Sequence, residues 1–254
     1  LQAIVSQYRN LGAYMKQNRV TAGIVTLVWL ALAVVASAQI TPPRMVRTPD
    51  IHGDRVAFSA EGDLWLGSIA AGTAERLTLH EADEYGPRFS PDGAWIAFTA
   101  GYDGGQDVYV MPAAGGAPRR LTYDPAGAEA VDWTPDGARI LFRSRRGVPM
   151  VGSRLYLVPA AGGLPEALPM EKAAQGAFAP DGNRIAYCPM ALESHHWKRY
   201  RGGMANHIWI ADLKAKTFRR IHDDSINEQY PVWAGEAVFY VSEKDGPATL
   251  WRWD

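Results

Sequence analysis

The pentapeptide Phe89-Ser90-Pro91-Asp92-Gly93 returns along the chain as Trp133-Thr134-Pro135-Asp136-Gly137 and as Phe178-Ala179-Pro180-Asp181-Gly182. A fourth, degenerate copy is Trp233-Ala234-Gly235-Glu236. The complete copies begin about 44 residues apart, which is typical of the four-stranded blades of a β-propeller. Proline fixes φ, aspartate bonds to nearby backbone and glycine tolerates positive φ, so the motif predicts a tight turn. The repeat therefore predicts an all-β protein built from propeller blades.

Two apolar, aromatic-rich segments follow each turn and predict two strands per unit. The first segments are residues 95–98, 139–142, 184–187 and 237–240, and the second are 107–110, 154–157, 207–210 and 249–251. A first unit without the turn motif keeps the same pair at 55–58 and 63–66. Units close near Leu77-Thr78, Leu121-Thr122 or Leu168-Pro169. We therefore expect five blade units within residues 39–254, the fifth cut short, so that the propeller ring is incomplete.

The predicted strands show little alternation of apolar and polar residues. Strands that are buried on both faces have this pattern, as expected where blades stack on one another. A β-sandwich would also contain many short strands. It would not explain a repeat of this period with constant turn chemistry, so the propeller is favoured.

Composition limits the classes of partner. Hydrophobic residues make up 47% of the 254 residues and charged residues 21%, which is ordinary for a globular protein. The net charge of −1 gives no support to nucleic acid or an anionic membrane surface as a partner. Cys188 is the single cysteine, so no disulfide can form within the chain, and its apolar neighbours predict a buried thiol.

The N-terminal region has the three parts of a secretory signal peptide. Met15, Lys16 and Arg19 form a short basic region, residues 20–35 are uncharged and mostly apolar, and Ala36-Ser37-Ala38 offers small residues for a signal peptidase. We expect residues 15–38 to be the signal peptide, with Gln39 as the first mature residue, and residues 1–14 to be an upstream extension. An uncleaved membrane anchor is the alternative. Either way, the segment predicts a secreted or periplasmic protein, with the signal segment as its only membrane contact.

No catalytic, cofactor or metal motif is found in the sequence. It lacks G-x-S-x-G, both glycine-rich phosphate-binding motifs and H-E-x-x-H. The loop from Asp103 to Asp107 has too few regularly spaced oxygen ligands for calcium and is interpreted as a surface turn. We therefore expect neither a catalytic residue nor a bound cofactor or metal in this chain.

One connection breaks the repeat. In the fourth unit, residues 189–206 join the two strands and contain five cationic or titratable side chains and two aromatic ones within eight residues. The candidate binding residues there are Trp197, Lys198, Arg199, Tyr200 and Arg201. Long loops on rigid scaffolds often carry function, and the cations could bind peptide carboxylates while the aromatic rings stack. The alternative, left open here, is that the rings pack the loop onto its own blade and the charges are solvated.

The same connection carries a family resemblance. Trp197-Lys198-Arg199-Tyr200-Arg201-Gly202-Gly203, followed by Ile208-Trp209-Ile210, resembles the first propeller of tricorn-type proteases. The Pro-Asp-Gly turns and Leu-Thr endings are shared more widely, with WD40-like Tol-system propellers and the propellers of prolyl oligopeptidases. The resemblance covers residues 48–254.

The resemblance implies a large serine peptidase with two propellers that gate or channel peptides. Its catalytic residues would lie in later domains, including a PDZ-containing region, so none is assigned here. It implies peptides and those later domains as partners, leaves homo-oligomerisation open, and implies six blades, of which this sequence would reach the fifth. The alternative function is a non-catalytic periplasmic Tol-type propeller that binds partner proteins.

Overall fold

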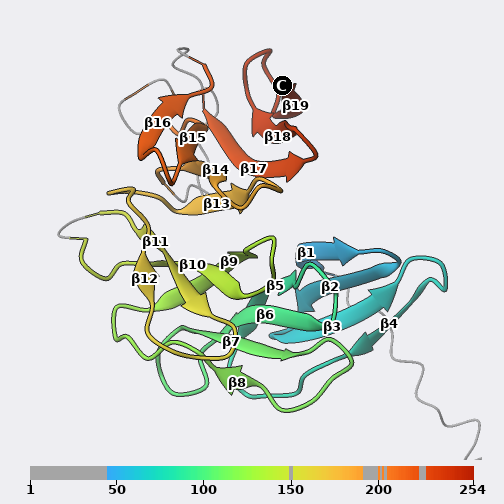
Figure 1. Cartoon of the computed structure of the whole chain (residues 1–254). Helices are drawn as coiled ribbons and strands as arrows, with labels where there is room; N and C mark the ends of the chain where they lie inside the picture. The colour runs from blue at the N-terminus through green and yellow to red at the C-terminus, as the bar shows by residue number, and fades with distance from the viewer. Residues whose placement is uncertain (1–44, 149–150, 191–199, 201, 203–204, 223–226) are drawn as a thin grey trace, which may run out of the picture. The chain divides into compact units, whose positions relative to one another are not determined.

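The computed structural model describes residues 45–148, 151–190, 200, 202, 205–222 and 227–254. Within these residues the regular structure consists of β-strands, which form five antiparallel sheets (Figure 1). Each sheet contains strands that are consecutive in the sequence, so each is one blade. The predicted signal peptide, residues 15–38, lies outside the described residues.

The first four blades have four strands each and the fifth has three. Blade 1 contains β1 (Arg47–His52), β2 (Arg55–Ala60), β3 (Asp63–Ser68) and β4 (Thr73–Arg76). Blade 2 contains β5 (Glu84–Phe89), β6 (Trp95–Ala100), β7 (Asp107–Pro112) and β8 (Arg119–Arg120). Blade 3 contains β9 (Ala128–Trp133), β10 (Arg139–Ser144), β11 (Arg154–Pro159) and β12 (Glu166–Ala167). Blade 4 contains β13 (Gln175–Phe178), β14 (Arg184–Cys188), β15 (Trp209–Asp212) and β16 (Thr217–Arg220), and blade 5 contains β17 (Glu228–Ala234), β18 (Ala237–Ser242) and β19 (Thr249–Trp253).

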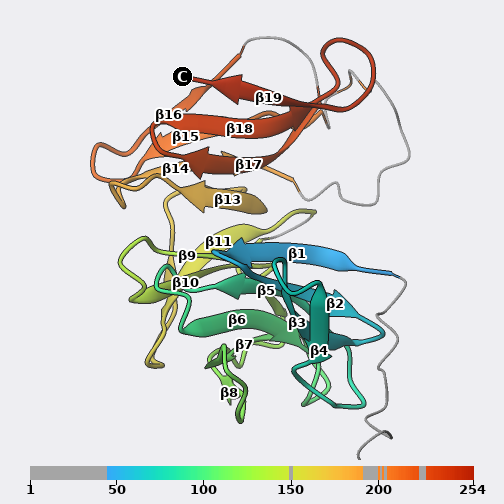
Figure 2. The same ribbon diagram turned by 90° about the vertical axis from the view of Figure 1, so that its right-hand side faces the viewer.

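The first strand of each blade is its inner strand, and these strands contact one another in chain order. β1 contacts β5, β5 contacts β9, β9 contacts β13 and β13 contacts β17. The colour gradient of Figure 2 follows the same order of blades. No contact of similar extent joins β17 back to β1 among the described residues. The predicted β-propeller with five blade units and an incomplete ring is therefore confirmed.

The Pro-Asp-Gly turns adopt the predicted conformation. Gly93, Gly137 and Gly182 have φ between 66° and 67°, where a side chain would be strained. In the first copy, the Gly93 amide donates to the Ser90 carbonyl at 2.7 Å, and the Asp92 carboxylate accepts from the Ser90 hydroxyl at 2.5 Å. The turn therefore forms from local interactions and fixes where each second strand begins.

The Leu-Thr endings close a blade through the threonine hydroxyl. The Leu64 amide donates to Thr78 Oγ1 at 2.9 Å, and the Val108 amide donates to Thr122 Oγ1 at 2.9 Å. Each hydroxyl in turn donates to a buried carboxylate, that of Glu84 for Thr78. The threonine thus accepts from the amide of the second residue of the third strand, Leu64 in β3 and Val108 in β7.

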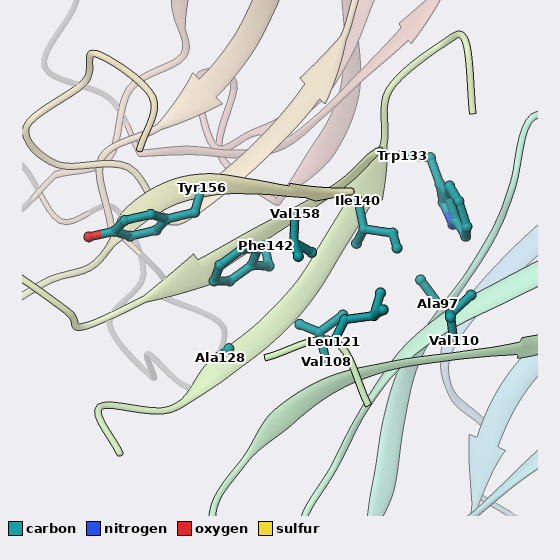
Figure 3. Packing of buried hydrophobic residues seen from close by; sticks show 10 residues of the cluster. All are labelled: Ala97, Val108, Val110, Leu121, Ala128, Trp133, Ile140, Phe142, Tyr156 and Val158. Atoms are coloured by element: carbon teal, nitrogen blue, oxygen red, sulfur yellow. The ribbon is translucent and has the colours of Figure 1, made fainter. Parts of the chain in front are cut away.

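The core is divided into clusters between neighbouring blades. Buried side chains of blades 2 and 3 pack together there, as Figure 3 shows: Ala97, Val108, Val110, Leu121, Ala128, Trp133, Ile140, Phe142, Tyr156 and Val158. Ile140 and Phe98 are fully buried, and so are most residues of β6, β7 and β10. Burial on both faces explains the weak alternation in the sequence.

The inner strands contain a repeated irregularity. Thr48, Gly86 and Tyr230 have φ of 46°, 64° and 56°, each is followed by proline, and the pairing register shifts at each of these dipeptides. Proline has no amide hydrogen to donate, so the ladder breaks there and the strand bulges. In blades 1 and 2 the side chain after the bulge, Asp50 or Arg88, bonds to the neighbouring blade.

The predicted second and third strands of each unit are all present. One differs in its start: β15 begins at Trp209 rather than at residue 207. Cys188 is buried, as its apolar neighbours predict. Asp107, interpreted as part of a surface turn, is instead buried at the start of β7, because Arg120 Nη2 binds its carboxylate at 2.6 Å and the Thr122 hydroxyl donates to it. No helix among the described residues is long and apolar enough to span a membrane.

Candidate functional site

Most of the predicted binding loop lies outside the described residues. Four of its five candidate residues lie outside the described residues: Trp197, Lys198, Arg199 and Arg201. The fifth, Tyr200, is half-buried, and its ring lies so close to Gly202 that a β-carbon there would collide with it. This local packing concerns Tyr200 alone, and peptide binding by the loop remains a prediction.

The structure brings a different set of ionisable residues together, on the inner strands. One position is equivalent in the five blades when their turn sequences are aligned. It follows the bulge in blades 1, 2, 3 and 5, whereas the pairing of β13 with β14 in blade 4 has no register shift. This position is occupied by Asp50, Arg88, Asp132, Ala177 and Val232 in blades 1 to 5. Blades 1 to 3 therefore carry alternating charges at this position, whereas blades 4 and 5 carry apolar side chains.

These charged residues connect one blade to the next. Asp50 of blade 1 accepts a hydrogen bond from the Phe89 amide of blade 2 at 2.7 Å. Arg88 of blade 2 donates from Nε to the Val131 carbonyl of blade 3 at 2.9 Å. Asp132 of blade 3 accepts from the amide of the following residue at 2.8 Å and also from the Phe178 amide of blade 4. Each charge thus satisfies backbone groups that the bulges leave without a ladder partner.

Burial raises the pKa of both carboxyl groups. The pKa of Asp132 is raised to about 6, because desolvation outweighs the hydrogen bond from the Trp133 amide and the attraction of Arg88. The pKa of Asp50 is also raised, again mainly by desolvation, and the Phe89 amide and the charge of Arg88 oppose that rise. Asp132 therefore gains or loses its proton close to neutral pH.

The arrangement offers alternating acceptors and donors along the interior of three blades. Arg88 can donate to a carboxylate or a peptide carbonyl, and Asp50 and Asp132 can accept from an ammonium or an amide group. An extended polypeptide carries all of these groups. The sequence contains a signal for this set, since each member lies immediately before a turn copy or its equivalent, but aspartate and arginine beside a turn are read as solvated residues without the fold.

Metal chemistry finds no support in the geometry. Within the described part of the chain, no three histidine, cysteine, aspartate or glutamate side chains come together in a way that could hold a metal ion. Asp103 and Asp107 both bind Arg120, at 2.8 and 2.6 Å. The acidic loop is thus engaged in an internal ion pair.

Comparison with known proteins identifies relatives for nearly the whole described chain. The family model described as the tricorn protease N-terminal beta propeller domain matches residues 43–254. Tricorn protease homolog 1 of Streptomyces coelicolor is 35% identical over 214 residues, which are 82% of this chain and 20% of that protein. Tricorn protease of Thermoplasma acidophilum is 28% identical over 222 residues, covering 84% of this chain and 20% of that protein.

Solved structures show the same relationship. A crystal structure of the tricorn protease superposes with a TM-score of 0.72 at 28% identity, covering 84% of this chain and 21% of that one. A putative TolB from Agrobacterium tumefaciens superposes with a TM-score of 0.65 at 22% identity, covering 80% of this chain and 71% of that one. The second likeness shows the fold alone. The chain spans about a fifth of the length of the tricorn relatives it matches.

Proposed function

We propose that this chain, which belongs to the tricorn protease family and forms its N-terminal β-propeller, admits and positions peptides for a serine peptidase whose catalytic domains lie outside it. The family match supports the peptidase, since it covers residues 43–254 and the relatives are about five times longer. The role of the propeller is then that of a gate and scaffold for peptides.

The alternating charges of the inner strands carry the proposal. Asp50, Arg88 and Asp132 lie at one aligned position of three consecutive blades, next to backbone that the bulges free from the ladder. A peptide in extended form would exchange its hydrogen bonds to water for bonds to these groups as it passes. Their opposite signs would suit a chain of mixed composition without retaining one net charge.

The test separates peptide admission from chemistry. In the full-length protein, Arg88→Gln and Asp132→Asn should lower kcat/KM for a peptide of about 20 residues several-fold, while a short fluorogenic reporter, small enough to bypass the propeller, is turned over as before. Glu171→Gln, an exposed residue away from the inner strands, is the matched control. Equal losses for long and short substrates would contradict a gating role, and absence of any peptidase activity in the full-length protein would contradict the enzyme.

We also propose that the basic loop captures peptides. Its cations Lys198, Arg199 and Arg201, together with Trp197 and Tyr200, give the fourth blade unit a cluster of donors for carboxylates. The signal segment at residues 15–38 supports a place for the protein outside the cytoplasm, where it would act on extracytoplasmic peptides.

A further inference from the structure

A second binding feature emerges when the blades are compared with one another. One position is the residue that begins the second strand, which in blades 1, 2 and 4 lies beside the turn of the next blade. It is occupied in blades 1 to 5 by Arg55, Trp95, Arg139, Arg184 and Ala237. The contacts of this side chain in each pair of blades indicate which chemical groups can fill the space beside the turn.

Between blades 1 and 2 an arginine fills that space. Arg55 Nη2 donates to the Gly93 carbonyl at 2.6 Å, and its guanidinium lies 5.1 Å from the centroid of the Phe89 ring. His52 Nε2 lies 3.1 Å from the Pro91 carbonyl oxygen. A β-carbon on Gly93 would collide with the side chains of Arg55 and His52. The crevice is thus occupied by groups of the chain itself.

Between blades 4 and 5 the same device recurs. The Arg184 guanidinium lies 5.2 Å from the centroid of the Trp233 ring, and its Nη2 donates to the Glu236 carboxylate at 3.1 Å. Between blades 3 and 4, Arg139 instead pairs with Glu166 of its own blade. A guanidinium between an aromatic ring and the turn of the next blade therefore occurs twice in this protein. In both cases the arginine is the first residue of the second strand.

Between blades 2 and 3 the arginine is replaced by Trp95, and the space is open. A cavity of about 650 Å³ lies there, with Trp95 and Trp133 in its walls. Residue Trp95 is 42% exposed, and the nearest atom to a β-carbon built on Gly137 is a Pro91 side-chain carbon at 3.7 Å. Figure 3 shows Trp133 at the border of the core cluster, next to Val110, which also lines the cavity.

The polar groups of the cavity suit a cation. Within the described residues, the carbonyl oxygens of Pro135 and Gly137 accept no hydrogen bond, although their counterparts in blade 2 bind His52 and Arg55. Hydrogen bonds from the Ser90 and Thr134 hydroxyls are the main cause that lowers the pKa values of the Asp92 and Asp136 carboxyl groups, so both groups remain ionised at neutral pH. Both aspartates line the cavity.

One cation already lines the cavity. Arg119 Nη2 donates to the Ala160 carbonyl of blade 3 at 2.6 Å. The two ionised carboxylates outnumber this one guanidinium, so the net charge of the cavity walls is negative. An anionic ligand would meet two like charges and a guanidinium that already donates to the Ala160 carbonyl, whereas a cationic ligand meets free acceptors and aromatic faces.

We propose that this cavity binds the arginine side chain of a peptide, with the guanidinium against the indole rings of Trp95 and Trp133 and donating to the carbonyl oxygens of the turn at Gly137. The site names the side chain that is recognised in the peptides of the proposed function, and in this respect the inference rests on that function. Binding at the site needs no catalytic domain and is therefore testable apart from turnover.

The first experiment uses the chain as it is and a minimal probe. N-acetyl-Gly-Arg-Gly-amide is titrated into the protein by isothermal calorimetry, alongside the same peptide with citrulline, which keeps the shape of arginine but not its charge. We expect saturable binding of the arginine peptide and at least tenfold weaker binding of the citrulline peptide. Equal affinities, or no binding of the arginine peptide at millimolar concentration, would overturn the proposal.

Variants then locate the site. Trp95→Arg should fill the cavity from within, as Arg55 does in the neighbouring crevice, and lower the affinity for the arginine peptide at least tenfold with no fall in the melting temperature. Asp136→Asn should lower it several-fold, and Asp181→Asn, the same change in the turn of blade 4, should leave it unchanged. Unaltered binding by Trp95→Arg would refute this location. Loss of peptide turnover with retained arginine binding would contradict the proposed function and not this site.

Discussion

At the scale of single residues, aspartate occurs in two environments that shift its pKa in opposite directions. Aspartate in the turns accepts local hydrogen bonds at the surface, and its pKa is lowered, as in Asp136. Aspartate on the inner strands bonds to neighbouring backbone under burial, and its pKa is raised, as in Asp132. The first kind is stable as a carboxylate on its own turn, whereas the second depends on two other blades.

The raised pKa of Asp132 makes stability depend on pH. Because the folded state holds this proton up to about pH 6, the contribution of Asp132 to stability is full below its unfolded pKa and is lost as pH rises through 6. Asp132→Asn has no such loss, so its stability relative to the natural protein should rise by about 1 to 1.5 kcal/mol between pH 5 and pH 8. Urea unfolding of both proteins at each pH measures this difference.

Asp136→Asn is the control with the opposite sign. Its lowered pKa means that the carboxylate contributes stability above the unfolded pKa and loses it as pH falls through the folded pKa. The relative stability of Asp136→Asn should therefore improve toward acid pH. A pH-independent difference between Asp132→Asn and the natural protein would show that Asp132 is solvated in the fold.

At the scale of elements, turns and strands are specified in different ways. The turns with Gly93, Gly137 and Gly182 form from neighbouring residues, and the second and third strands have apolar side chains for both faces of the blade. The connection at residues 189–206 follows neither pattern. Its charges are therefore the natural target for a test of function at this scale.

Replacing Lys198, Arg199 and Arg201 together by Gln should weaken peptide capture by the full-length protein several-fold. A partly desolvated charge-assisted hydrogen bond contributes about 1.5–3 kcal/mol and an exposed ion pair about 0–1 kcal/mol. The effect should shrink at high salt, because screening already weakens exposed contacts. KM for a peptide substrate at low and high salt is the measurement.

The packing interpretation gives the contrary result. Trp197→Ala and Tyr200→Ala would then lower the melting temperature while the triple Gln variant handles peptides normally. Tyr200, whose ring lies against Gly202, is expected to show part of this loss of stability in any case. Unchanged KM in the triple Gln variant at both salt concentrations would leave the loop without a role in capture.

At the scale of the whole molecule, the blades are coupled by side chains that cross from one to the next. The Ala130 amide of blade 3 donates to Thr99 Oγ1 of blade 2 at 2.9 Å, and the Tyr230 amide of blade 5 donates to Gln175 Oε1 of blade 4 at 2.9 Å. Apolar clusters fill the spaces between the same blades. Cooperation among blades thus rests on both kinds of contact.

The predicted signal segment, residues 15–38, gives a prediction for the N-terminus of the mature protein. With its native start, the full-length protein should lose all residues through Ala38 on export, because basic, apolar and small-residue regions follow in the order that signal peptidase requires. N-terminal sequencing of the exported protein should begin at Gln39. A mature protein that keeps residues 20–35 would identify the segment as a membrane anchor.

The sequence alone determined the repeat, the turns and two strands of every blade, because these depend on local φ preferences and on apolar side chains that are contiguous in the chain. The inner strand of each blade could not be predicted from the sequence. Segments such as Gly86-Pro87-Arg88 read as irregular, since proline and glycine interrupt the ladder, and their amides find partners only on another blade, as Gly86 does at Thr48 Oγ1. The charged line of Asp50, Arg88 and Asp132 and the open cavity beside Trp95 are likewise products of tertiary structure, because each exists only where residues some 40 positions apart are brought side by side by the stacking of blades.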